Sequence, residues 1–148
     1  MKKLSIYVKT VALLVCLLFL VGCGGDAMDE DNIVLITERF FVQQTQEIWL
    51  NPQGYIGRAI RYQGMFFSQD WEGETFHMVV RFADDCCGGG GAIGFEVYIG
   101  DIEPFADDTW VEVTGILEFH DDGDGEILRL NVVSLIEMEE RGASTVQI

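Results

Sequence analysis

The sequence is poor in lysine, which argues against a nucleic-acid-binding protein, and poor in long apolar runs, which argues against a membrane-spanning one. Its only lysines are Lys2, Lys3 and Lys9, all near the N-terminus. The longest uncharged apolar run, Val11 to Val21, has eleven residues, whereas a membrane-spanning helix needs about 20. The run is therefore predicted to be the apolar region of a secretory signal, with a plain transmembrane anchor as the alternative.

The residues that end this run predict a lipid anchor. The four-residue sequence Leu20-Val21-Gly22-Cys23 resembles a bacterial lipobox, in which a cysteine receives a diacylglyceryl group and becomes the new N-terminus. Two acyl chains hold a protein stably on a membrane where one is marginal. We therefore predict a signal peptide over residues 1–22 and a lipidated Cys23 on the extracytoplasmic face of a bacterial cell membrane. Residues 23–32 would then form an acidic, flexible tether.

Cleavage of the signal would leave a strongly acidic protein without lysine. The remaining 126 residues hold six arginines against 25 acids, so the net side-chain charge falls from −16 to −19. Such a surface is repelled by nucleic acid and by anionic lipid headgroups. The composition argues against DNA or RNA binding, and it fits solubility, attraction of cations or a basic partner.

Residues 33–148 are long enough for one domain, and they begin with a helical pattern. A helix is predicted over residues 37–50, with Thr37 as its cap and residues 51–55, which hold a proline and a glycine, as its stop. The residues expected on its buried face are Phe41, Thr45, Ile48 and Trp49.

From residue 59 the apolar period changes to two, which is typical of strands. Five strands are predicted, over residues 59–67, 75–82, 94–100, 109–119 and 126–138. Glycines inside the first and fourth strands, Gly64 and Gly115, fit sharp bends, and the last strand shifts phase near Val133, as at a bulge. The pattern predicts a mainly β fold, a small OB-like five-stranded barrel preceded by one α-helix. An open antiparallel sheet is the alternative.

Within these strands the pattern also assigns faces. Phe76, Met78, Val80 and Phe82 are expected on one face of the second strand, and His77, Val79 and Arg81 on the other, polar face. In the later strands we expect buried side chains at Phe95, Val97, Ile99, Val111, Val113, Leu117, Phe119, Leu128, Leu130 and Val132.

An ordered set of short motifs resembles the C-terminal domain of the YcgQ-like proteins. The motifs are Asn-Pro-x-x-Tyr-x-Gly at 51–57, Arg-Phe at 81–82, the Cys86-Cys87 pair, and Asp-Asp-x-Trp-Val-x-Val-x-Gly at 107–115. The resemblance covers about residues 38–137 and implies a non-enzymatic accessory subunit of a two-component membrane permease. Members of that family usually carry transmembrane helices ahead of this domain, whereas a lipobox and a tether stand there in this chain.

The pair Cys86-Cys87 is the candidate site, because Cys16 would leave with the signal and Cys23 would be lipidated. Thiolates are soft ligands for zinc, copper(I) or arsenic-like ions, and Asp84 and Asp85 would attract cations. Neighbouring strand residues point to opposite faces, so a shared metal needs irregular backbone, which the following glycines allow. His77 would join the pair only if the chain folds back. Packing, a vicinal disulfide and a redox switch stay open as alternatives.

No other segment carries a catalytic set. The sequence has two histidines, His77 and His120, and neither a Gly-x-Ser-x-Gly motif nor a phosphate loop. The acidic segment at 120–126 is too short for a calcium loop of the helix–loop–helix kind and predicts a hairpin turn. Asp107 and Asp108 are expected in a solvated turn, and Trp110 in the core. The function hypotheses are therefore a permease accessory lipoprotein, a free-standing soft-metal lipoprotein and a thiol-redox lipoprotein.

We predict that replacing both Cys86 and Cys87 with serine abolishes binding of zinc, copper(I) or arsenite and leaves the fold intact. Thiols in a loop contribute little to a core. Denaturation and metal titration therefore separate a role as metal ligands from a role in core packing. If the pair instead packs, the double variant loses about 1–3 kcal/mol of unfolding free energy and neither protein binds metal. Unchanged metal affinity in the double variant would contradict the ligand hypothesis.

Overall fold

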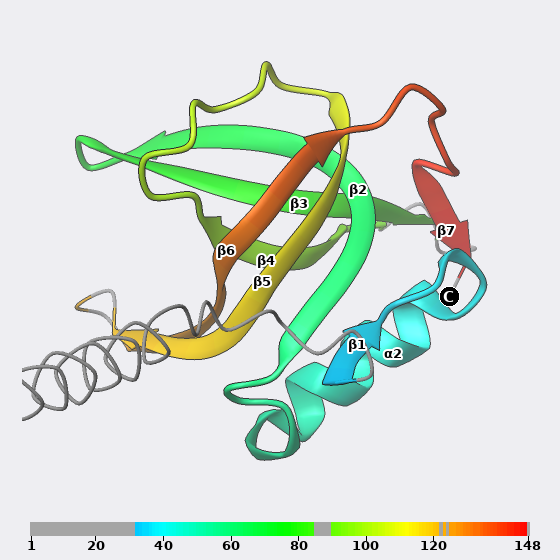
Figure 1. Ribbon diagram of the computed structural model, residues 1–148, viewed down its shortest axis with the longest axis horizontal. Coiled ribbons are helices and arrows are strands. Elements are labelled where there is room, and N and C mark those ends of the chain that lie inside the picture. Colours follow the sequence, from blue (N-terminus) through cyan, green and yellow to red (C-terminus); the bar gives the residue numbers. More distant parts are fainter. Residues whose placement is uncertain (1–31, 85–89, 122, 124, 148) are drawn as a thin grey trace, which may run out of the picture.

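The long strand β2 (Ala59–Trp71) organises the sheet. In the computed structural model, which describes residues 32–84, 90–121, 123 and 125–147, β2 curves across the molecule (Figure 1). Its first part, Ala59 to Phe66, pairs antiparallel with β5 (Thr109–Asp121), and its last part pairs antiparallel with β3 (Glu74–Asp84). The bend in β2 therefore allows one strand to begin both arms of the sheet.

The two arms meet and close a ring of five strands. Strand β4 (Ala92–Tyr98) pairs antiparallel with β3 and parallel with β6 (Glu126–Glu137), and β6 pairs antiparallel with β5. The mainly β, OB-like prediction is thus confirmed, and all five predicted strands are present. Two three-residue strands were missed: β1 (Ile33–Leu35) lies parallel to β2, and β7 (Thr145–Gln147) lies parallel to β3.

The predicted helix is present and covers one end of the ring. It begins with a 3-10 turn, η2 (Glu38–Phe40), continues as α2 (Phe41–Leu50) and is followed by a second 3-10 turn, η3 (Pro52–Gly54). Thr37 precedes η2, but its side chain does not cap it. Instead, the N–H and hydroxyl of Thr37 both donate to Gln44 Oε1, at 2.9 and 3.2 Å.

Close backbone approach explains the predicted bends. A Cβ at Gly64 would lie 2.9 Å from the Val80 carbonyl oxygen, and one at Gly115 would lie 2.9 Å from the Asn131 carbonyl oxygen. At Gly115 the register of β5 on β6 also shifts, because Thr114 pairs with Ser134 and Gly115 with Val132. Val133 is the extra residue, which confirms the bulge predicted from the change of phase.

The face assignment of β3 was only partly right, because Val80 is buried as expected but the opposite face is not a solvated, polar one. Val79 is fully buried and Arg81 is 2% exposed, whereas Phe82 is 43% exposed. Both faces of β3 carry apolar side chains. Because Arg81 is charged, its face was expected to be exposed to solvent, although Arg81 points into the core. Phe119, which we expected in the core, is 37% exposed on β5, and Trp49 is 47% exposed on α2. The other core assignments in β4, β5 and β6 are confirmed, except that Val132 is only partly buried and packs against the edge of the core.

Arg81 is buried because the fold supplies a partner for most of its polar head. Its Nε donates to the Gln63 carbonyl oxygen at 2.8 Å, and Nη1 donates to Glu38 Oε2 at 3.1 Å and to the Ala143 carbonyl oxygen at 3.2 Å. The guanidinium carbon lies 4.9 Å from the ring centroids of both Phe41 and Trp110. Burial lowers the pKa of Arg81, and the hydrogen bond that Arg81 donates to Glu38 opposes that shift.

We expect Arg81→Ala to lower the free energy of unfolding by about 3 kcal/mol or more, because it removes a buried, hydrogen-bonded cation and its ring contacts. Arg58→Ala is the matched control: Arg58 is exposed and its guanidinium contacts only the Tyr55 ring, 5.6 Å from the centroid, among the contacts described for it. Its loss should stay below about 1 kcal/mol. Urea denaturation measures both, and equal losses would contradict the assignment.

Candidate binding groove

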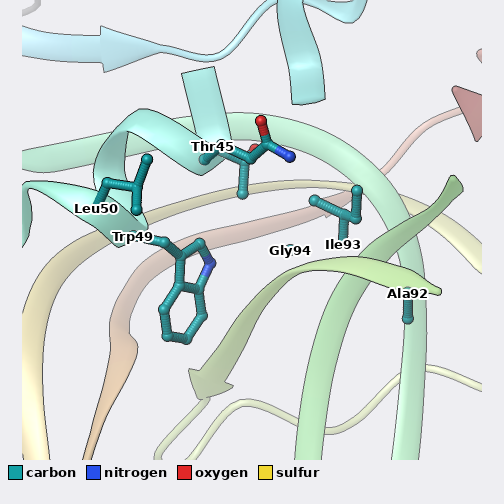
Figure 2. Close-up of a pocket in the computed structure, with 7 residues that line it drawn as sticks. Thr45, Trp49, Leu50, Ala92, Ile93 and Gly94 are labelled. Carbon is teal, nitrogen blue, oxygen red and sulfur yellow. The ribbon is translucent and has the colours of Figure 1, made fainter. Parts of the chain in front are cut away.

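A groove opens between α2 and the first half of β4. Its volume is about 520 Å³, within the ~300–1,000 Å³ range of ligand pockets. Figure 2 shows Trp49 reaching from the helix toward the strand that carries Ile93 and Gly94. The described residues that line it are Thr45, Gln46, Trp49, Leu50, Ala92, Ile93 and Gly94, and none of these is charged. The groove is therefore an uncharged, mainly apolar hollow in a very acidic chain.

The helix wall of the groove exposes two large apolar side chains. The Trp49 indole stacks on the Phe95 ring, with centroids 5.7 Å apart and an interplanar angle of 7°, and 47% of Trp49 remains exposed. Leu50, at the last position of α2, is 78% exposed. Exposed apolar side chains that line a concave surface are typical of binding sites. The adjacent pair Trp-Leu just ahead of Asn-Pro was the sequence signal for this wall.

Thr45 adds a polar group to the floor of this groove. It is fully buried, and its hydroxyl has no hydrogen-bond partner in the structure. A buried hydroxyl without a partner costs about 1–3 kcal/mol. Thr45 has no accessible surface, so an occupant would recover that cost only where a small shift of α2 or β4 uncovers the hydroxyl. With such a shift, a ligand with a polar group as well as apolar surface would be favoured.

The strand wall of the groove is an open edge of the sheet. Strand β3 pairs with β4 from Ala92 to Glu96, but β6 pairs with β4 only from Glu96 to Tyr98. Along Ala92 to Gly94, no described strand lies on the side of β4 that faces away from β3. A Cβ at Gly94 would meet the Val79 carbonyl oxygen, so β3 and β4 approach closely just where the far edge is open.

The predicted cysteine site lies outside the described residues, as do Asp85 and the lipidation candidate Cys23. The chain leaves β3 at Asp84, whose side chain is exposed, and re-enters the sheet at Ala92. Cys86 and Cys87 therefore belong to the connection between the second and third strands of the ring. Ala92 is also the first β4 residue lining the groove, so this connection leads directly to it.

His77 lies at the other end of β3 from Asp84. Seven residues of strand separate the two positions, or about 23 Å, so the structure does not bring them together. His77 is not on a solvated polar face either: its ring stacks on Phe66, with centroids 5.3 Å apart, and its Nδ1 is 3.0 Å from Ser68 Oγ. Burial lowers the pKa of His77, and the nearby Asp107 carboxylate partly opposes this shift.

A second hollow, of about 320 Å³, brings both histidines together with charged side chains. His77 and His120 line it with Glu74, Glu96 and Arg129. In the part of the chain that the structure describes, no three His, Cys, Asp or Glu side chains are grouped so that they could hold a metal ion. This hollow is therefore polar but offers no metal-ligand set among those residues.

The motif around Trp110 serves the fold. Asp107 Oδ1 accepts a hydrogen bond from the Ser68 N–H at 2.8 Å, and Asp108 has a left-handed backbone with a φ of 68°. Its carboxylate pairs with Arg141 at 2.6 Å, which lowers the pKa of Asp108. Trp110 is buried, as predicted.

The acidic segment at 120–126 is a hairpin turn, because Asp121 pairs with Glu126 across β5 and β6. Asp121 Oδ1 accepts a hydrogen bond from the Gly123 N–H at 2.9 Å, an arrangement typical of aspartate in turns. Asp122 and Asp124 lie outside the described residues. The hairpin prediction for this segment is confirmed.

The fold and the groove define a small, mainly β domain with an OB-like ring and a helix at one end. The chain belongs to the DUF1980 C-terminal domain family, whose match spans residues 24–143. Comparison with curated proteins gives no match. None of the helices within the described ranges is long and apolar enough to cross a membrane.

We predict that the protein loses stability as the pH falls from 7.5 to 5.5, in part through His77. The folded state lowers the pKa of His77, so the unfolded chain binds the proton more readily once the pH drops below about 6.5. His77→Gln should make the unfolding midpoint in urea depend less on pH over this window. His120→Gln serves as the control, and an equal change of slope in both variants would contradict the assignment.

Proposed function

We propose that the protein is a lipid-anchored, extracytoplasmic and non-enzymatic accessory subunit of a membrane permease. One observation carries the proposal: the family match begins at residue 24, directly after the lipobox-like sequence that ends at Cys23. The matched segment thus begins one residue after the predicted lipid attachment and includes the proposed tether ahead of Ile33. A lipidated cysteine at that position would tether the domain itself.

The length of the tether fits a partner in the membrane. The ten residues from Cys23 to Asn32 reach at most about 35 Å when extended, and they average about 16–19 Å if flexible. Strand β1 begins at Ile33. The domain would therefore stay within reach of the extracytoplasmic loops of a membrane protein, with a net acidic surface that disfavours contact with anionic lipid.

The resemblance to YcgQ-like permease subunits supports the same role. Several of the motif residues that carry the resemblance stabilise the fold. Arg81 hydrogen-bonds to three segments of the chain. Asp107 and Asp108 shape a turn, and Trp110 lies in the core. Motifs that maintain a fold without assembling a reacting centre are typical of a binding or accessory domain. This reading favours a partner-binding role over catalysis.

The cysteine pair supports a second candidate function, binding of a soft metal ion. Cys86 and Cys87 lie outside the described residues, and this candidate rests on the chemistry of two adjacent thiols in a glycine-rich connection. Asp84, just ahead of them, is exposed at the end of β3 and would add negative charge. Zinc or copper(I) would be held through the two thiolates, with Asp85 as a further predicted ligand. His77, about 23 Å from Asp84 along β3, would not join this set.

We expect Cys23→Ser to block acylation and leave an unprocessed precursor, because the modified thiol is lost. Labelling with a radioactive fatty acid and the mass of the protein measure both effects. Normal acylation of this variant would contradict the anchor.

For the partner, the wild type and a form secreted with a cleavable signal are crosslinked in intact cells. A multi-spanning protein recovered only with the anchored form supports the proposal, and recovery of none contradicts it.

A further inference from the structure

We propose that the groove between α2 and β4 binds an extended, uncharged peptide segment, which adds as a strand along Ala92 to Gly94. The inference rests on the proposed function in one respect: the segment would belong to the extracytoplasmic side of the membrane partner. The chemistry that selects it comes from the groove itself. It combines an open strand edge with apolar walls and one unpartnered buried hydroxyl.

The hydrogen-bond pattern shows which backbone groups face the groove. The Ala83 N–H donates to the Gly91 carbonyl oxygen at 2.9 Å, whereas the Phe82 N–H points the other way and donates to Ser144 at 2.8 Å. Phe82 and Ala92 are therefore a pair without mutual hydrogen bonds. By alternation, the N–H and C=O groups of Ala92 and Gly94 point away from β3, into the side that β6 does not reach.

An extended peptide fits these groups better than a small apolar molecule. Donors and acceptors that repeat every second residue match the backbone of an added strand, which is a common mode of peptide recognition. A small apolar ligand would leave them unpaired and would leave the Thr45 hydroxyl without a partner as well. A flat membrane surface would not enter a hollow between a helix and a strand.

The charge of the groove indicates the composition of the segment. The helix α2 contains one acid, Glu47, and none of the described lining residues is charged, although the whole chain carries a net charge of −16. A basic segment would gain more electrostatic attraction at the acidic faces of the protein than in this groove. Side chains that contact Trp49, Leu50 and Ile93 should therefore be apolar, with a hydroxyl or amide near Thr45.

The test uses Ala92→Pro, which removes the N–H on the open edge without touching the ladder to β3. Ala92→Ser is the matched control because it keeps the N–H. The full chain, in phosphatidylcholine vesicles, is used to select binders from displayed random seven-residue peptides. We expect uncharged, apolar peptides whose affinity falls about tenfold in Ala92→Pro and is unchanged in Ala92→Ser. Thermal unfolding checks that both variants fold.

Selection of basic peptides, of none, or of peptides that bind Ala92→Pro as well as the wild type would overturn the inference. Thr45→Val refines it: weaker peptide binding assigns the hydroxyl to the ligand. A photocrosslinking residue at Leu50 in cells then distinguishes the two proposals. Edge-dependent peptides without a crosslink to a membrane protein support the groove and contradict the permease role. A membrane protein that co-purifies with the protein, but does not crosslink at Leu50 and still binds Ala92→Pro, supports the permease role and contradicts the groove.

Discussion

The buried guanidinium of Arg81 connects parts of the chain that are far apart in the sequence. It joins η2 through Glu38, β2 through the Gln63 carbonyl, and the segment before β7 through the Ala143 carbonyl. The same carboxylate oxygen of Glu38 also accepts the Ala143 N–H at 3.2 Å. These bonds fix how the helix, the sheet and the C-terminal segment meet. Without them, α2 would still pack on the core through Phe41, Val42 and Ile48, but the C-terminal segment would be held mainly by the three-residue strand β7.

The groove depends on this arrangement because its two walls come from different parts of the fold. The first residue of α2, Phe41, lies against the Arg81 guanidinium, and Trp49, two turns later, stacks on Phe95 of β4. Tyr62 completes the support: its hydroxyl donates to the Val79 carbonyl oxygen at 2.7 Å and accepts the Phe95 N–H at 3.3 Å. Contacts at the first and the last turn of α2 therefore hold the helix against the sheet. These core contacts fix the width of the groove between α2 and β4.

Local pattern predicted most of this fold, whereas the groove required knowledge of tertiary pairing. Period-two alternation located all five strands of the ring, and the phase change at Val133 located the bulge. The same reasoning placed Val79 and Arg81 of β3 on a polar face, because it could not foresee that a charge stacked on rings and hydrogen-bonded can be buried. It also placed Trp49 in the core, since periodicity cannot tell a buried face from the wall of an open groove. The parallel pairing of β4 with β6 joins residues about 33 positions apart and has no local signal.

An open strand edge is a liability that proteins usually manage with charge, proline or a covering element. Along Ala92 to Gly94 this chain has no charged residue and no proline, and its cover is incomplete, since Trp49 stays half exposed and Leu50 almost fully exposed. In a chain with 25 acids, one more on this edge would have blocked unwanted pairing at little cost. The absence of charge at this edge is therefore better explained by a strand that binds there than by the needs of the fold alone.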